Sequence, residues 1–156
     1  LKTNKKFTEF FKKLHLICFK GTKEFAGELR TVEVIIRDGY GNVVHQGAPA
    51  KNVAKLLHSL CTWYDAHKDK YPPLLLAAVM HNEFEKIHPF QDGNGRVGRL
   101  LLNYVLLRHK YPPLNVRFRD RVRYYKCLQL YDHKNDLKST LKFLVSQYRQ
   151  RKVSTK

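Results

Sequence analysis

The segment from His88 to Arg99, HPFQDGNGRVGR, gathers the residues whose types and spacing could carry out chemistry. Gly93 and Gly95 permit positive φ, and their missing side chains let a ligand approach the backbone. A helix that starts just after them, near Arg96, would present unpaired N–H groups and the positive end of its dipole to an anion. The segment therefore predicts a phosphate-binding loop at a helix N-terminus.

The charged side chains of this segment suit a nucleotide. Arg96 and Arg99 are three residues apart, so both can project from the first helical turn and offer forked donors to phosphate oxygens. The Asp92 carboxylate would repel phosphate unless a hard cation such as Mg²⁺ lay between them. His88, whose unperturbed pKa is near 6.5, can accept a proton at neutral pH. Positioning and charge stabilisation of this kind are the main needs of transfer from a nucleotide.

Two helices must hold this loop. Pro89 disfavours helical geometry at His88, which predicts that a helix starting at Pro73 ends there. The next helix, over 96–109, is apolar on nearly every side, which is typical of a helix at the centre of a bundle. Its apolar residues are Leu100, Leu101, Leu102, Val105, Leu106 and Leu107.

The rest of the chain is mostly helical in pattern. Helical spacing of apolar residues extends over 5–19, 49–68, 120–131 and 136–148, and Gly21 is expected to end the first of these helices. Residues 31–37 are rich in β-branched types and predict a strand, which the turn residues 38–42 return into a second strand at 43–45. A lone hairpin cannot form a core and must lie on helices. The predicted fold class is a mostly α helical bundle that carries one β-hairpin.

Composition sets further limits. The chain has 156 residues, enough for one domain, and its net charge of +17 would attract polyanions such as ATP, nucleic acid or acidic protein surfaces. It has no run of eighteen apolar residues, so we expect no membrane span. Three widely spaced cysteines predict a reduced, cytoplasmic setting. Because the chain starts at Leu1 and its only methionine is Met80, we expect it to be part of a longer protein.

The segment HPFQDGNGRVGR resembles the signature of the Fic domain family, H-P-F-x-D/E-G-N-G-R-x-x-R, and matches all nine fixed positions. The resemblance extends from about residue 26 through the hairpin to the Tyr124-Tyr125 pair and beyond. It implies an N-terminal helix over 1–25, a catalytic domain over 26–148 and a basic tail over 149–156. Within that domain the hairpin over about 31–46 would be the family's flap.

The resemblance also implies an activity and roles for the loop. In this family the signature histidine deprotonates a Ser, Thr or Tyr hydroxyl, which attacks the α-phosphate of ATP and releases pyrophosphate. His88 would be this base, Asp92 the Mg²⁺ ligand and Phe90 a buried anchor of the loop. The nucleotide phosphates would meet Asn94, the N–H groups of Gly93 and Gly95, and the side chains of Arg96 and Arg99.

Outside the loop, the resemblance implies two further contacts. The edge of the flap at Val43, Val44 and His45 would pair with the backbone of a target protein. Adenosine would lie against Tyr124, Tyr125 and Asp132. Many relatives have asparagine where this chain has Asp132, and an aspartate can accept a hydrogen bond from the adenine amino group but cannot donate one.

Regulation and nucleotide choice can also be compared with the family pattern. A kinase branch replaces the second loop glycine with lysine, so Gly95 favours AMP transfer. The inhibitory pattern S/T-x-x-x-E-G/N does not occur in this sequence. We therefore expect that this chain, as given, does not inhibit itself, and that an inhibitory segment lies in a missing flank or in a separate partner protein.

Other interpretations of these residues stay open. The basic surface could bind nucleic acid, with the loop acting as a nucleotide sensor, or the chain could transfer another nucleotide or a phosphate. Tyr124 and Tyr125 could equally be core residues, and His81 a packed or solvent histidine. Glu85-x-x-His88 would need a second copy to build a di-metal site, and the chain has none.

Overall fold

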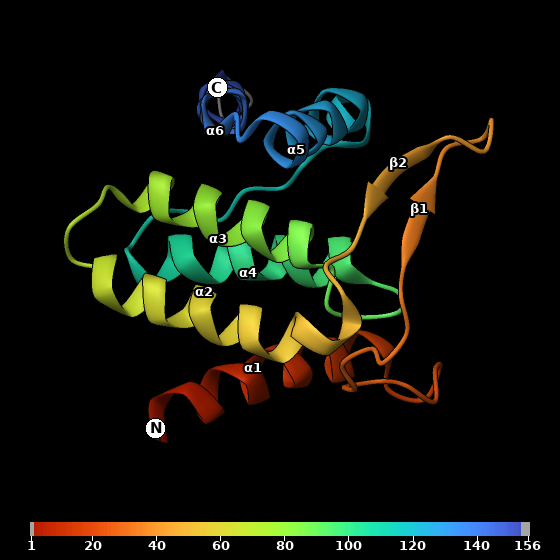
Figure 1. Cartoon of the computed structure of the whole chain (residues 1–156). Coiled ribbons are helices and arrows are strands. Elements are labelled where there is room, and N and C mark those ends of the chain that lie inside the picture. The colour runs from red at the N-terminus through yellow and green to blue at the C-terminus, as the bar shows by residue number, and fades with distance from the viewer. Residues whose placement is uncertain (1, 154–156) are drawn as a thin grey trace.

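The structure is a computed structural model that describes residues 2–153, with side chains described for 8–150. Six α-helices form a bundle over the described residues, and one short hairpin lies at its side, as the sequence pattern predicts (Figure 1). The helices are α1 (Lys2–Phe19), α2 (Val53–His67), α3 (Pro73–Ile87), α4 (Asn94–Arg108), α5 (Arg121–Lys134) and α6 (Leu137–Val153), and single 3₁₀ turns at Ala50–Asn52 and Phe118–Asp120 precede α2 and α5.

The helix α3 lies at the centre of the bundle. It packs against α2, α4, α5 and α6, while α1 covers the far side of α2 and α4 (Figure 1). Its side chains Leu76, Ala77 and Phe84 are fully buried, which explains an apolar sequence with so few charges. Pro73 opens α3, and the helix ends at Ile87, directly before His88, as the proline pattern predicts.

The helix α4 differs from its prediction in two ways. It begins at Asn94 instead of near Arg96, so Gly95 is a helical residue. Of the two glycines in the segment 93–95, only Gly93 has a positive φ, at 80°. It is also not enclosed on every side, because Leu100 and Leu107 are 42% and 56% exposed. Its buried face, which includes Leu101 and Val105, packs on α3 and α1.

The helix α1 packs into the same core as α2 and α4. Phe11 is fully buried, and α1 contacts both of these helices. The helix ends at Phe19, and Gly21 follows with a φ of 76°, as expected for a glycine that terminates a helix. Ile17, which the helical spacing places on the apolar face, is 67% exposed instead.

The hairpin projects from the end of the bundle at which α3 gives way to α4 (Figure 1). It consists of β1 (Ile35–Arg37) and β2 (Val43–Gln46), with Ile36 opposite His45 and a bulge before Arg37. The first strand is shorter than the predicted 31–37. The turn is held by the Asp38 carboxylate, whose Oδ1 accepts the N–H groups of Tyr40 and Asn42, each at 2.9 Å.

None of the helices described over residues 2–153 is long and apolar enough to cross a membrane. The predicted basic tail over 149–156 is partly helical, because α6 extends to Val153, and residues 154–156 lie outside the described residues.

Candidate active site

The loop between α3 and α4 is fixed by two left-handed residues. His88 caps α3 with φ 54° and ψ 62°, and Gly93 precedes α4 with φ 80°. A left-handed conformation is unusual for a histidine and costs free energy, so the surrounding structure must hold it. Reversal at both ends turns the chain sharply and brings the signature residues of the loop together.

Asn94 closes the loop from inside. Its Oδ1 accepts the backbone N–H of Phe90 at 2.9 Å, and its Nδ2 donates to the Phe90 carbonyl at 2.7 Å. Asn94 is 2% exposed and Phe90 is fully buried. Phe90 is therefore enclosed in the core, and Asn94 uses both ends of its amide on the loop backbone.

The loop rests on α1, through a residue to which sequence reasoning gave no role. His15 is fully buried, its Nδ1 accepts the N–H of Gly27 at 2.8 Å, and its Nε2 donates to the Asp92 carbonyl at 3.0 Å. Its ring stacks on Phe90 with centroids 4.0 Å apart. Because burial lowers the pKa of His15, the ring is neutral, as one donor and one acceptor nitrogen require. His15 thus ties the loop to the N-terminal helix.

A second α1 residue, Phe19, lies directly against the turn at Gly93. Its ring occupies the space that a side chain on Gly93 would need. The Arg96 guanidinium stacks on the same ring, with Cζ 4.2 Å from the centroid. Cation–π stacking restrains this long side chain while leaving its N–H groups available.

The N-terminus of α4 has the features of an anion site. As the first residues of the helix, Asn94 and Gly95 have N–H groups with no carbonyl one turn earlier to accept them. The first turn contains no acidic residue, and Arg96 and Arg99 add positive charge. The helix dipole and these cations act in the same direction, so a phosphate would be stabilised there.

Asp92 is the residue of the loop that could hold a cation. It is exposed, and its Oδ1 accepts the Gly93 N–H at 2.6 Å. No cluster of three or more His, Cys, Asp or Glu side chains suited to a metal occurs in the part of the chain that the structure describes. A single carboxylate fits Mg²⁺, which is commonly held by one or two carboxylates, waters and the substrate's own phosphates.

The hydrogen bonds and burial of His88 decide which of its ring nitrogens carries a proton. Its Nδ1 lies 3.2 Å from the Glu85 carbonyl, which can only accept, so Nδ1 carries the proton and Nε2 keeps its lone pair. Burial, helped by the nearby His45 and Arg30, lowers the pKa of His88 to about 4. The imidazole is therefore neutral at pH 7 and able to take a proton at Nε2.

A buried arginine holds the backbone at His88. The Arg30 guanidinium is 3% exposed and donates to the carbonyls of His88 at 2.6 Å and Ile87 at 3.2 Å. It also donates to the carbonyls of Val32 and Ala48, which lie just before and just after the hairpin. One side chain therefore fixes the base of the hairpin to the end of α3 and supports the unusual backbone of His88.

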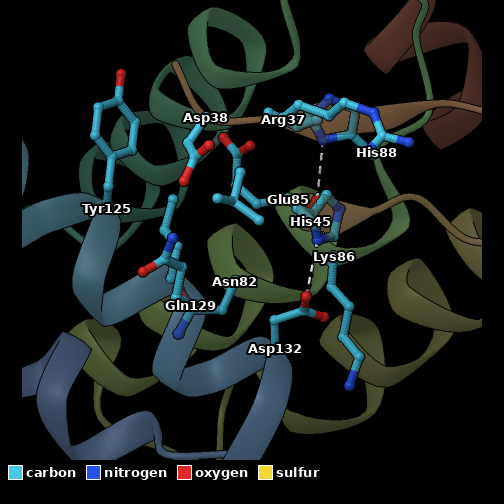
Figure 2. Close-up of a pocket in the computed structure, with 13 residues that line it drawn as sticks. Arg37, Asp38, His45, Asn82, Glu85, Lys86, His88, Tyr125, Gln129 and Asp132 are labelled. Atoms are coloured by element: carbon cyan, nitrogen blue, oxygen red, sulfur yellow. Dashed lines mark hydrogen bonds and ion pairs between the residues drawn. The ribbon is translucent and has the colours of Figure 1, made fainter. Parts of the chain in front are cut away.

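A cavity of about 460 Å³ opens beside His88, between the hairpin, α3 and α5 (Figure 2). Its volume lies within the range of small-molecule sites. Most of the residues that line the cavity are polar or charged, and Ile36, Val44, Leu128 and the Tyr125 ring add apolar wall. The lining residues comprise Ile36, Arg37, Asp38, Val44 and His45 from the hairpin, Asn82, Glu85, Lys86 and His88 from the α3 side, and Tyr125, Leu128, Gln129 and Asp132 from α5.

The hairpin is fastened to α5 by a pair that crosses this cavity. His45 Nδ1 and Asp132 Oδ2 are 2.8 Å apart, and both side chains are largely shielded from solvent. The His45 ring lies between Asp132 and His88, with its centroid 5.2 Å from that of His88 (Figure 2). His45 and Asp132 therefore contact each other. The sequence predicts separate roles for them, target docking for His45 and adenosine binding for Asp132, and does not predict this contact.

The two neighbouring tyrosines have different surroundings. Tyr125 is 54% exposed and lines the cavity. Tyr124 is 4% exposed, is absent from the cavity wall, and has its hydroxyl 2.8 Å from His81 Nε2. The structure thus places Tyr125 and Asp132 at the cavity and Tyr124 behind it.

A sequence model described as the Fic/DOC family matches residues 6–106 of this chain. The chain belongs to the Fic/DOC family. It is 32% identical over 120 residues to the protein adenylyltransferase Fic of Nematostella vectensis, a match that covers 76% of this chain and 26% of that protein. It is 35% identical over 94 residues to the protein of the same name from Drosophila melanogaster, covering 60% of this chain and 19% of that protein. The chain thus spans about a quarter or less of these curated relatives.

Solved Fic structures have the same fold. A Fic family protein from Desulfovibrio desulfuricans superposes with a TM-score of 0.79 at 32% identity, covering 95% of this chain and 47% of that one. A Fic domain containing signaling protein from Bacteroides thetaiotaomicron gives a TM-score of 0.80 at 28% identity, covering 90% and 58%. The mostly helical fold with one hairpin is therefore the Fic fold.

Sequence reasoning missed several residues that organise this Fic/DOC site. His15, Arg30 and Glu85 all lie against the signature loop or its arginines, yet none belongs to the signature. One signal was present, because a histidine at an otherwise apolar helical face and an arginine beside a glycine turn are costly to bury unless they have partners. Their partners are distant in sequence, so the pairing itself was not predictable.

Proposed function

We propose that this Fic/DOC chain transfers AMP from Mg·ATP to a Ser, Thr or Tyr hydroxyl of another protein and releases pyrophosphate. One observation carries this proposal: a neutral His88, with a lone pair on Nε2, lines a nucleoside-sized cavity and begins the loop that leads into a helix N-terminus suited to phosphate. The relatives named protein adenylyltransferase Fic support the same activity.

The nucleotide would lie with its base and ribose in the cavity and its phosphates toward α4. Tyr125 would provide a ring for the base, and Asp132 an acceptor for an amino group of adenine. The α-phosphate would meet the N–H groups of Gly95 and Asn94, and the β- and γ-phosphates would meet Arg96 and Arg99. This order places the α-phosphate nearest His88.

The chemical step then needs one proton acceptor. The oxygen of the target hydroxyl forms a bond to the α-phosphorus while its proton moves to Nε2 of His88. The bond between the α-phosphorus and the bridging oxygen breaks, and its electron pair leaves with pyrophosphate. Arg96 and Arg99 would stabilise the charge that develops on this leaving group. Mg²⁺ held by Asp92 would supply further neutralisation of the phosphate charge when bound.

The target would be positioned by the hairpin. Backbone pairing with a strand edge orients a hydroxyl without demanding much sequence, and we place this contact at the edge formed by Val43, Val44 and His45. All three residues of β1 are exposed, whereas Val44 and His45 are half-buried. The outer edge of β1, at Ile36, is therefore a second place where the target backbone could add.

The proposal is tested by incubating the chain with lysate proteins, Mg²⁺ and ATP labelled on the α-phosphate. We expect label on a protein band with the wild-type chain and none with His88→Ala. The matched control is His58→Ala, which removes an exposed histidine of α2 that does not line the cavity and should leave labelling unchanged.

The other outcomes are equally specific. Label that arrives only from the γ-phosphate would show phosphorylation and would contradict AMP transfer. Retention of nucleic acid by the chain, with no label transferred from any ATP, would favour the binding module that the charge of +17 suggests.

A further inference from the structure

A buried polar chain runs behind the cavity from α4 through α3 to α5. His81 is 1% exposed, and its Nδ1 lies 2.9 Å from the Gly98 carbonyl. Its Nε2 lies 2.8 Å from the hydroxyl of Tyr124, which is 4% exposed. Buried polar groups of this kind are costly without partners, and each of these has one.

The direction of each hydrogen bond in this chain is fixed. The Gly98 carbonyl can only accept, so Nδ1 of His81 donates to it, and Nε2 must then be the acceptor. Burial lowers the pKa of His81 to about 4, which keeps the ring neutral and preserves this arrangement. The Tyr124 hydroxyl therefore donates its proton to His81, and the lone pairs of its oxygen face away.

Those lone pairs meet Arg99. The Arg99 side chain hydrogen-bonds the Tyr124 hydroxyl and so opposes the rise that burial causes in the Tyr124 pKa. Its Nη1 also lies 3.2 Å from the position that a Cβ on Gly95 would occupy, so the guanidinium folds back over the first turn of α4. The end of the polar chain is thus the second signature arginine.

A carboxylate lies on the other side of the same arginine. Glu85 Oε1 fills the space beside Gly98 and has no hydrogen-bond partner among the side chains described over 8–150. Burial raises the pKa of Glu85 to about 7, and the positive charge of Arg99 opposes this rise. An arginine free to swing would be drawn to this carboxylate and away from a phosphate.

We propose that His81 and Tyr124 are positioning residues that hold Arg99 ready for the terminal phosphates of the nucleotide. A tyrosine hydroxyl is suited to this task because it accepts from the guanidinium without cancelling its charge. Arg99 then keeps its full charge for phosphate and loses little side-chain entropy when the nucleotide arrives. This inference rests on the proposed function, which assigns the outgoing phosphates to Arg99.

The test compares the affinities of two nucleotides in the presence of Mg²⁺. Tyr124→Phe removes only the hydroxyl, and calorimetry should show ATP binding weakened about tenfold while AMP, which lacks the terminal phosphates, changes less than about twofold. Tyr64→Phe is the matched control, because the Tyr64 hydroxyl also pairs with a histidine, His109 Nε2 at 3.2 Å, away from the site. It should leave both affinities unchanged.

Two reference arms keep the outcomes apart. If Arg99→Ala does not weaken ATP more than AMP, the phosphate role of Arg99 fails and this inference fails with it. The other case is that Arg99→Ala weakens the binding of ATP more than that of AMP, as the phosphate role requires. If Tyr124→Phe then weakens the binding of both nucleotides equally, or of neither, only the positioning role of Tyr124 is overturned. A structural defect in Tyr124→Phe would produce this equal loss, so the ratio of the two affinities is the deciding quantity.

A measurement on the unaltered chain removes any dependence on the fold of a variant. Side-chain ¹⁵N relaxation of the arginine Nε–H groups reports motion on the picosecond to nanosecond timescale. Without nucleotide, Arg99 should be markedly more ordered than Arg119, which is exposed. Equal mobility of the two side chains would overturn the inference.

Discussion

A side chain at Gly93 should disturb both the stability of the chain and its nucleotide site. Gly93 has a φ of 80°, and an added Cβ would overlap Cε2 and Cζ of the buried Phe19 ring. The backbone conformation alone costs an L-residue about 1–2 kcal/mol. Forcing a carbon into a packed ring adds about 1–3 kcal/mol. Gly93→Ala should therefore lower the free energy of unfolding by about 2–5 kcal/mol.

Gly21→Ala separates these two costs. Gly21 has a φ of 76°, almost that of Gly93, but nothing lies within 4 Å of its added Cβ. Gly21→Ala should therefore lower the free energy of unfolding only by the backbone cost, about 1–2 kcal/mol. Urea unfolding followed by circular dichroism measures both changes. Phe19→Leu replaces the ring by a smaller side chain. In that background, the loss of unfolding free energy caused by Gly93→Ala should fall to the loss caused by Gly21→Ala.

Two results would refute this reasoning. One is equal destabilisation by Gly93→Ala and Gly21→Ala in the wild-type background, which would mean that Phe19 does not restrict the loop. The other is full additivity of Phe19→Leu and Gly93→Ala, because residues in direct contact should show coupling. Since Arg96 stacks on Phe19, Gly93→Ala should also weaken ATP binding.

Three further predictions concern the base, its backbone and the hairpin. Because burial lowers the pKa of His88 to about 4, kcat/KM for AMP transfer should show no acidic fall near pH 6.5, and an acidic limb centred there would contradict the assignment. Arg30→Met should lower the free energy of unfolding by about 3 kcal/mol or more, since several buried carbonyls lose their donor, whereas the exposed Arg119→Met should change it by less than about 0.5 kcal/mol. Asp132→Ala should speed hydrogen exchange of the amide of His45 about tenfold, because the hairpin loses its tie to α5; unchanged exchange would show that the pair does not fasten it.

The helices on both sides of the active loop were predictable because local rules govern them. Pro73 opens α3 and Pro89 ends it, and both effects depend on a proline ring and its immediate neighbours. The start of α4 was placed two residues late because Gly95 was treated as a turn residue. In the fold, Asn94 already begins the helix by binding the backbone of Phe90 with its side chain.

Long-range packing accounts for what the sequence did not predict. Leu100 and Leu107 look like core residues, but the packing of the described helices leaves them 42% and 56% exposed. His15 supports the carbonyl of Asp92 from 77 residues away, and no local pattern encodes that contact. The signature residues could be identified from the loop, whereas the residues that hold them could be found only in the fold.

The separate roles expected for His45 and Asp132 illustrate the same limit. Each was placed near the site, one on the flap and one beside adenine, and both do line the cavity. Their direct contact depends on how closely the hairpin approaches α5, which the two segments do not determine separately. The spacing of residues along the chain predicts which face of a helix or strand a side chain lies on. Tertiary packing determines which other residues that side chain contacts.

The central claim is that AMP moves from ATP to a protein hydroxyl with His88 as the base. The most direct measurement is the mass of a labelled target peptide after reaction with Mg·ATP, together with the pyrophosphate released. The account predicts one AMP on a Ser, Thr or Tyr side chain for each pyrophosphate formed, and neither product with His88→Ala. A peptide that carries a single phosphate, or AMP transfer that persists in His88→Ala at the wild-type rate, would contradict it.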